Sequence, residues 1–311
     1  MAFLGSGLLY AGDAKSTPFY VVALIMNSFI KGSYRLKDGG SQLAKALVKQ
    51  IRVYGGEVLK HKEVIRAEMH SDKSLKSVIC SDGTRFEGHQ FVFNLHPSKF
   101  IEVIGKENFI PAYVKRINKL KNTVSSFLVY ISLKENVFPY LNSNFYDYFT
   151  EDGWNTVDYD KETWPHIVYS CTPISSKSDE FADTFVAMTY MSKEEVEQWE
   201  NSFNTIRDRK VRSDEYEAFK KAKEALVIEK LALRFPLLKE AIKNCYSSTP
   251  LTYRDYLGTP EGELYGIEKD YVVIPNAVDE IFLTPSSVPE QRDPSLVICV
   301  GRIEGLKNQL N

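Results

Sequence analysis

The strongest constraint on the fold is a helix followed by a run of short strands between residues 38 and 95. Asp38-Gly39-Gly40-Ser41 is typical of the turn and N-cap that begin a helix, and Gly55-Gly56 is typical of a helix end. Between them, leucine and isoleucine recur at every fourth position, as on one face of an α-helix. These apolar positions are Leu43, Leu47 and Ile51. We therefore predict a helix with Ser41 as its N-cap.

Short strand-like segments follow this helix without a second helix between them. The predicted strands are Glu57–Leu59, Glu63–Met69, Leu75–Cys80, Thr84–Glu87 and Gln90–Leu95. Ser81-Asp82-Gly83 has the composition of a tight hairpin turn. A helix and a β-meander are predicted here, and not a repeated strand–helix–strand pattern.

The middle of the chain has a different pattern. Ser125–Leu133 and Thr184–Met191 read as strands, and Ser213–Phe235 reads as a long helix that Pro236 ends. The side chains expected on the apolar side of that helix are Tyr216, Phe219, Leu226 and Leu233. These segments predict a substrate domain with a mixed sheet.

The last third of the chain changes character near residue 270. Residues 249–270 are rich in Gly, Tyr and Pro, whereas Leu296–Val300 is a continuous apolar run typical of a buried parallel strand. A parallel strand needs a crossover helix, and residues 301–311 are too few to supply one. We therefore expect the C-terminal α/β piece to be truncated.

Charge, cysteine and hydropathy exclude several classes of protein. Lys and Arg total 39 against 41 Asp and Glu, so the net charge of −2 gives no reason to expect a nucleic-acid partner. Cys80, Cys171, Cys245 and Cys299 are far apart, which predicts neither a metal site nor a disulfide framework and favours a reducing, cytoplasmic location. The apolar run 19–30 is too short to span a membrane, although it could be a peripheral contact with one.

Three segments resemble the phytoene desaturase, carotenoid isomerase and retinol saturase family. They are YRLKDGGSQLAKALVKQIRVYGGEVLKHKEVIRAE, SDGTRFEGHQFVFNLHP and TYRDYLGTPEGELYGIEKD. The resemblance covers about residues 3–270. It implies an amine-oxidase-like two-domain fold with mixed α/β and α+β character, FAD as cofactor, and a polyene or isoprenoid lipid as substrate, drawn from a membrane surface.

The resemblance also implies roles for individual residues. On the cofactor side, Gly39 and Gly40 match the glycines before the helix that packs on the dinucleotide domain, Val64 matches the strand beside the adenine, and Asn94 matches the return of the chain towards FAD. On the substrate side, the matching residues are Tyr253, Thr259, Pro260, Gly262 and Tyr265. Each tyrosine could equally be ordinary core. No acid, base or nucleophile for catalysis is identified.

A second resemblance concerns residues 271–311. VVIPNAVDEIF and LVICVGRIEGLKN are similar to the start of the nucleotide-sugar domain of GT-B glycosyltransferases of the family 4 type. It implies that Arg302 and Lys307 would neutralise a sugar-donor diphosphate. The segments that carry the two resemblances meet near Lys269–Tyr271. Because the two families are unrelated, this predicts a fusion or a rearranged reading frame.

Four regions follow from these resemblances. They are a partial FAD-binding region 1–98, a substrate domain 99–248, a return segment 249–270 and a glycosyltransferase-like segment 271–311. No GxGxxG motif occurs in the chain, so we expect it to bind FAD weakly by itself and to be an inactive fragment of an oxidoreductase. A glycosyltransferase fragment and a non-enzymatic remnant are the alternatives.

Overall fold

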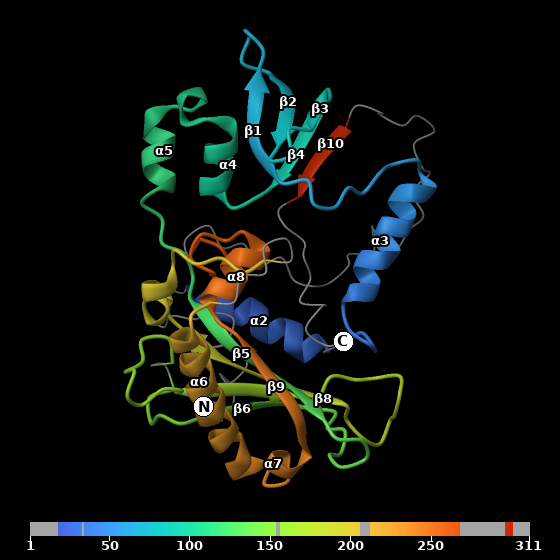
Figure 1. Ribbon diagram of the computed structural model, residues 1–311, viewed down its shortest axis with the longest axis vertical. Helices are drawn as coiled ribbons and strands as arrows, with labels where there is room; N and C mark the ends of the chain where they lie inside the picture. Colours follow the sequence, from blue (N-terminus) through green and yellow to red (C-terminus); the bar gives the residue numbers. More distant parts are fainter. Residues whose placement is uncertain (1–17, 33, 154–155, 206–211, 268–295, 301–311) are drawn as a thin grey trace. The chain divides into compact units, whose positions relative to one another are not determined.

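The structure is a computed structural model that describes residues 18–32, 34–153, 156–205, 212–267 and 296–300 (Figure 1). The chain divides into two compact units. The first combines Met1–Leu47, Asn122–Pro275 and Gly305–Asn311, and the second combines Val48–Lys121 and Asn276–Glu304. Both contain helices and sheets, so the fold is mixed α/β. The domain boundaries predicted from the sequence stay predictions.

The helices and strands have the following bounds. The helices are α2 (Phe19–Lys31), α3 (Ser41–Val53), α4 (Pro97–Ile104), α5 (Pro111–Ile117), α6 (Asp214–Arg234), α7 (Leu238–Ala241) and α8 (Pro250–Leu257). Short 3-10 helices occupy Lys106–Asn108, Lys193–Glu195 and Glu197–Trp199. The strands are β1 (Val64–Met69), β2 (Leu75–Cys80), β3 (Arg85–Glu87), β4 (Gln90–Asn94), β5 (Ser125–Leu133), β6 (Asn144–Tyr148), β7 (Ile167–Cys171), β8 (Thr184–Met191), β9 (Ile242–Ser248) and β10 (Leu296–Val300).

The predicted meander is present in the second unit. Strands β1, β2 and β3 form an antiparallel sheet in that order. The predicted hairpin turn is confirmed: the Gly83 amide donates to the Cys80 carbonyl at 2.9 Å, and the Thr84 amide donates to Asp82 Oδ1 at 3.0 Å. The predicted strand Glu57–Leu59 is wrong, because these residues make no β-ladder in the structure.

The apolar run near the C-terminus is a strand, as predicted. Strand β10 pairs in parallel with β4, with Leu296 opposite Gln90 and Val300 opposite Asn94. Parallel pairing suits a strand without the polar alternation of a half-solvated antiparallel sheet.

The first unit is built on a five-stranded antiparallel sheet with the order β6-β7-β8-β5-β9. Helix α6 runs along this sheet (Figure 1), and its side chains share one hydrophobic core with those of the sheet. The core side chains from the strands and α6 include Phe127, Val129, Ile131, Val168, Phe185, Ala187, Met191, Val227 and Leu231. One face of the sheet is therefore covered by α6.

Helix α6 lies where the sequence places it, but its buried face is different. Ser213 caps the helix by accepting a hydrogen bond from the Tyr216 amide, and Arg234 is its last residue. Tyr216, Val227 and Leu231 are buried, whereas Leu226 is 46% and Leu233 76% exposed. The prediction that these two leucines lie on the buried side of the helix was wrong. Successive residues of a helix are rotated by about 100°, and this places both leucines outside the stripe that faces the sheet.

Helix α3 forms as predicted and buries none of its residues. It begins at Ser41 itself, so that Ser41 is its first helical residue and not the N-cap. Helix α2 covers most of the apolar run 19–30; its Ile25 is buried, and Phe19 and Ile30 are more than four-fifths exposed. None of the helices in the described part of the chain is long and apolar enough to cross a membrane.

Candidate functional site

The five-stranded sheet separates its aromatic residues by type. Successive side chains of a strand point to opposite faces, and the pairing registers fix which positions share a face. All the phenylalanines of these strands point towards α6. They are Phe127, Phe145 and Phe185. All their tyrosines point to the other face, which we call the tyrosine face. They are Tyr130, Tyr146, Tyr148, Tyr169, Tyr190 and Tyr246.

The tyrosine face is apolar and partly covered. Tyr190 and Ile167 are fully buried, and Met188, Tyr146 and Tyr169 pack partly buried against them. The rings of Tyr146 and Tyr169 lie 5.3 Å apart. None of the strand side chains on this face carries a charge. This surface suits a flat, apolar ligand, and the hydroxyl groups add polar partners.

Burial keeps these tyrosines neutral. It raises the pKa of Tyr130 and of Tyr148 to about 12, and it raises the pKa of Tyr169 further still. The tyrosine face therefore presents neutral hydroxyl groups that donate or accept hydrogen bonds over the physiological pH range.

Helix α8 brings the predicted Tyr253 to the tyrosine face. The helix begins with a capping box in which Thr249 and Thr252 bond to each other's backbone amides. Tyr253 is buried, and its hydroxyl lies 2.9 Å from Ser126 Oγ of β5. Burial raises the pKa of Tyr253, and the nearby Tyr130 and Tyr265 add to this rise. Tyr253 therefore lies near both Tyr130 and Tyr265.

The other predicted substrate residues lie just after α8. Gly262 is buried with φ +71°, and its carbonyl accepts a hydrogen bond from Ser125 Oγ. The Tyr265 amide donates to Thr123 Oγ1 at 3.0 Å. Pro260 is half-buried, and Thr259 has a buried Oγ1 without a hydrogen-bond partner. These contacts hold the segment at the end of the sheet; their role in substrate binding stays a prediction.

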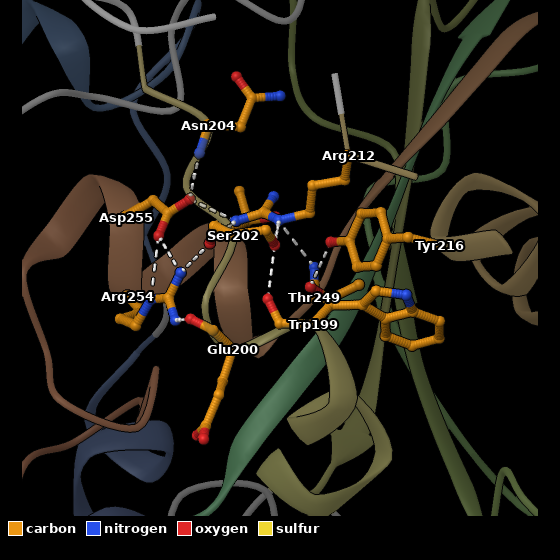
Figure 2. Close-up of polar contacts among 10 residues, drawn as sticks. Trp199, Glu200, Ser202, Asn204, Arg212, Tyr216, Thr249, Arg254 and Asp255 are labelled. Carbon is orange, nitrogen blue, oxygen red and sulfur yellow. Dashed lines mark hydrogen bonds and ion pairs between the residues drawn. The ribbon is translucent and has the colours of Figure 1, made fainter. Parts of the chain in front are cut away.

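A buried ion cluster below α8 escaped the sequence analysis (Figure 2). Asp255 is fully buried and accepts hydrogen bonds from Arg212, from Arg254 at 2.7 and 3.0 Å, and from the Asn204 amide at 2.8 Å. Arg254 also donates to the carbonyls of Glu200 and Ser202. The cluster ties residues 200–204 and Arg212 to α8, and therefore fixes the helix that carries Tyr253.

The predicted cofactor glycines have a structural role. Gly39 has φ +84°, and the turn that contains it is hydrogen-bonded to a distant loop: the Asp38 amide donates to the Ile174 carbonyl at 3.0 Å, and the Ser176 amide donates to Asp38 Oδ1 at 2.7 Å. The Ser176 bond lowers the pKa of Asp38. A Cβ at Gly39 or Gly40 would meet no atom within 4 Å, so neither glycine is needed for close packing.

The remaining predicted cofactor residues belong to the second unit. Val64 is the half-buried first residue of β1, and Asn94 is the exposed last residue of β4. The role of these four positions in holding FAD stays a prediction.

The second unit has an open hollow of about 520 Å³. Its walls include Met69, His70, Phe91, Phe93, Phe100 and Phe109. The rings of Phe93 and Phe100 lie 5.2 Å apart, and those of Phe100 and Phe109 lie 5.6 Å apart. None of the cofactor or substrate residues predicted from the sequence lines this hollow.

Two further kinds of site were considered in the sequence, a metal site and a diphosphate site. Within the described ranges, no group of three or more His, Cys, Asp or Glu side chains could hold a metal ion. Arg302 and Lys307 lie outside the described residues.

Comparison with known proteins places the chain near the retinol reductases. It is 22% identical to all-trans-retinol 13,14-reductase of Danio rerio over 292 residues, which cover 83% of this chain and 45% of that protein. The Rattus norvegicus protein is 24% identical over 286 residues, covering 84% and 45%. The chain thus spans about half the length of the curated relatives it matches. These matches support the resemblance to the retinol saturase family.

Solved structures give more distant matches. A protein from Pyrococcus furiosus has a TM-score of 0.48 and 15% identity, covering 86% of this chain and 59% of that one. An oxidoreductase from Methanosarcina mazei has a TM-score of 0.37 and 14% identity, covering 58% and 41%. No family model matches the chain. The glycosyltransferase resemblance of residues 271–311 is therefore unsupported.

Proposed function

We propose that this chain carries the substrate-binding part of an oxidoreductase that acts on retinoid-like or other polyene lipids. The tyrosine face is the observation that carries this proposal, because it joins aromatic rings, Met188 and Leu128 on one surface whose strand side chains carry no charge. A conjugated polyene is flat and apolar, so it can lie against such rings and displace water from them. The similarity to proteins named for retinol supports this choice of ligand.

In this proposal, the residues of the chain bind and orient the polyene and exclude water from it. Tyr146 and Tyr169 would contact its flat surface, and Tyr253 and Tyr265 would lie beside one end. The predicted contact of α2 with a membrane would let the ligand arrive from a lipid bilayer, and it too stays a proposal.

Removing a ring from the tyrosine face should weaken polyene binding. We expect Tyr169→Ala to raise the Kd for all-trans-retinol about tenfold, equal to about 1.4 kcal/mol, because the ligand loses an aromatic contact. Titration of the whole chain with retinol, followed by quenching of intrinsic fluorescence, measures this. Tyr140→Ala is the matched control, since Tyr140 lies outside the strands and its hydroxyl donates to the nearby Asn142. Equal effects of the two variants would contradict the proposal.

The FAD assignment leads to a separate expectation. We expect this chain by itself to bind FAD with a Kd weaker than about 1 µM and not to turn over a polyene. The free energy gained from a few contacts would not offset the translational and rotational entropy that is lost when FAD binds. A pyrophosphate is best held by the free amides of a Gly-rich helix start, and the turn at Gly39 is occupied by its own hydrogen bonds. Calorimetric titration with FAD measures the affinity, and a Kd at or below about 1 µM would refute the expectation.

A further inference from the structure

Two hydroxyl groups on the tyrosine face are buried without a hydrogen-bond partner. Tyr130 of β5 is 8% exposed and Ser248 of β9 is fully buried, yet neither Tyr130 Oη nor Ser248 Oγ has a partner in hydrogen-bonding geometry among the described residues. A buried hydroxyl that lacks a partner costs free energy, and such groups are rare in folded proteins. This pair therefore needs an explanation.

The pairing of the strands places the two groups together. Tyr130 lies opposite Tyr246, and Leu128 lies opposite Ser248, so Tyr130 and Ser248 are diagonal neighbours on one face. Long side chains reach each other across such a diagonal. Burial raises the pKa of Tyr130, and a weak hydrogen-bonding interaction with Ser248 offsets part of that rise. The two hydroxyls thus lie close to each other, but they do not meet in the geometry of a full hydrogen bond, and each still has hydrogen-bonding capacity.

Two other buried tyrosine hydroxyls of this unit are paired. Tyr253 Oη lies 2.9 Å from Ser126 Oγ, and Tyr216 Oη lies 2.8 Å from Thr249 Oγ1. In both cases a Ser or Thr hydroxyl satisfies the tyrosine. Tyr130 and Ser248 are residues of the same types, but their hydroxyls do not meet in hydrogen-bonding geometry. This indicates that a third group forms hydrogen bonds with both.

We propose that Tyr130 and Ser248 form a binding site for one neutral oxygen, an alcohol or a carbonyl, at the end of a polyene ligand on the tyrosine face. This inference rests on the proposed function and adds a substrate preference to it. The Arg35 guanidinium bonds to Asn144 of β6, at the opposite edge of the sheet, and neither β5 nor β9 places a charged side chain on this face beside Tyr130 and Ser248. A carboxylate would have no strand cation to pair with there, so a neutral oxygen fits best. Oxygenated polyenes should bind better than hydrocarbon ones.

The test compares two ligands that differ only in this oxygen. The whole chain is titrated with all-trans-retinol and with the hydrocarbon that has the same polyene but lacks the hydroxyl group. We expect Tyr130→Phe and Ser248→Ala each to weaken retinol binding about 3- to 10-fold, the usual effect of losing one hydrogen bond. Binding of the hydrocarbon should be unchanged, because both variants keep the apolar surface.

Thermal unfolding without ligand gives a second measurement. Tyr130→Phe should keep or raise the Tm, since it removes an unsatisfied buried hydroxyl. Ser247→Ala is the matched control: it breaks a satisfied buried hydrogen bond to Glu224 on the α6 side of β9, so it should lower the Tm and leave retinol binding unchanged.

The outcomes separate this inference from the proposed function. The inference is wrong if the wild type binds the hydrocarbon as tightly as retinol, or if Tyr130→Phe weakens both ligands equally or neither. A single buried water that fills the pair would produce the last result. A wild type that binds neither ligand overturns the proposed function, and the inference with it.

Discussion

Gly262→Ala is expected to destabilise the first unit severely. Gly262 has φ +71°, and a Cβ at this position would lie 2.0 Å from the Pro250 carbonyl oxygen. The left-handed backbone and the enforced movement of α8 together should lower the free energy of unfolding by about 3 to 5 kcal/mol. Urea denaturation followed by far-UV circular dichroism measures this change.

Gly258→Ala is the matched control for this prediction. Gly258 ends α8 with φ +73°, nearly the same backbone as Gly262, but a Cβ there would meet no atom within 4 Å. It should cost only the left-handed backbone penalty, about 1 kcal/mol. If the two variants are equally stable, Gly262 does not lie as close to the Pro250 carbonyl oxygen as the structure shows.

Asp255→Asn is the second change with a large expected effect. The Asp255 side chain is fully buried, with Arg212 4% and Arg254 15% exposed. Removing the carboxylate leaves two guanidinium groups without their counter-charge, which should lower the free energy of unfolding by about 3 to 5 kcal/mol. Because the cluster fixes α8, the variant should also weaken retinol binding. Chemical denaturation and the retinol titration measure the two effects.

Asp179→Asn is the control for the ion cluster. Asp179 pairs with Lys37 at 3.1 Å, but its side chain is 86% exposed, and solvent screens such pairs. Its stability should stay close to that of the wild type. A similarly small effect of Asp255→Asn would mean that the buried cluster contributes little to the fold.

Local sequence signals predicted most of the secondary structure. The hairpin at Asp82-Gly83, the strands Ser125–Leu133 and Thr184–Met191, and the long helix α6 all follow from residues close in the chain. Turn and cap residues act on neighbouring backbone groups, so their effect can be predicted without knowing the fold. The segment Glu57–Leu59 shows the limit, because a strand exists only where another strand pairs with it.

The candidate site was predictable only in part. The motif that contains Tyr253 and Gly262 was found from its resemblance, and the structure places it at the end of the sheet. Tyr130 and Ser248 were missed, since 118 positions separate them and nothing local marks either one. One signal was available in the sequence. In a strand that contains both residue types, phenylalanine and tyrosine are separated by an odd number of positions, so their side chains point to opposite faces, as at Phe127 and Tyr130.

The sequence by itself thus determined helices α3 and α6, the hairpin of β2 and β3, strands β5 and β8, and which positions of a strand share a face. Tertiary structure decided what each face meets. Strand pairing brought Tyr130 beside Ser248, and the fold joined Arg212 to Asp255 across 43 positions. Burial, charge pairing and unsatisfied hydroxyls depend on neighbours from distant parts of the chain, and these neighbours are set by the packing of the whole unit.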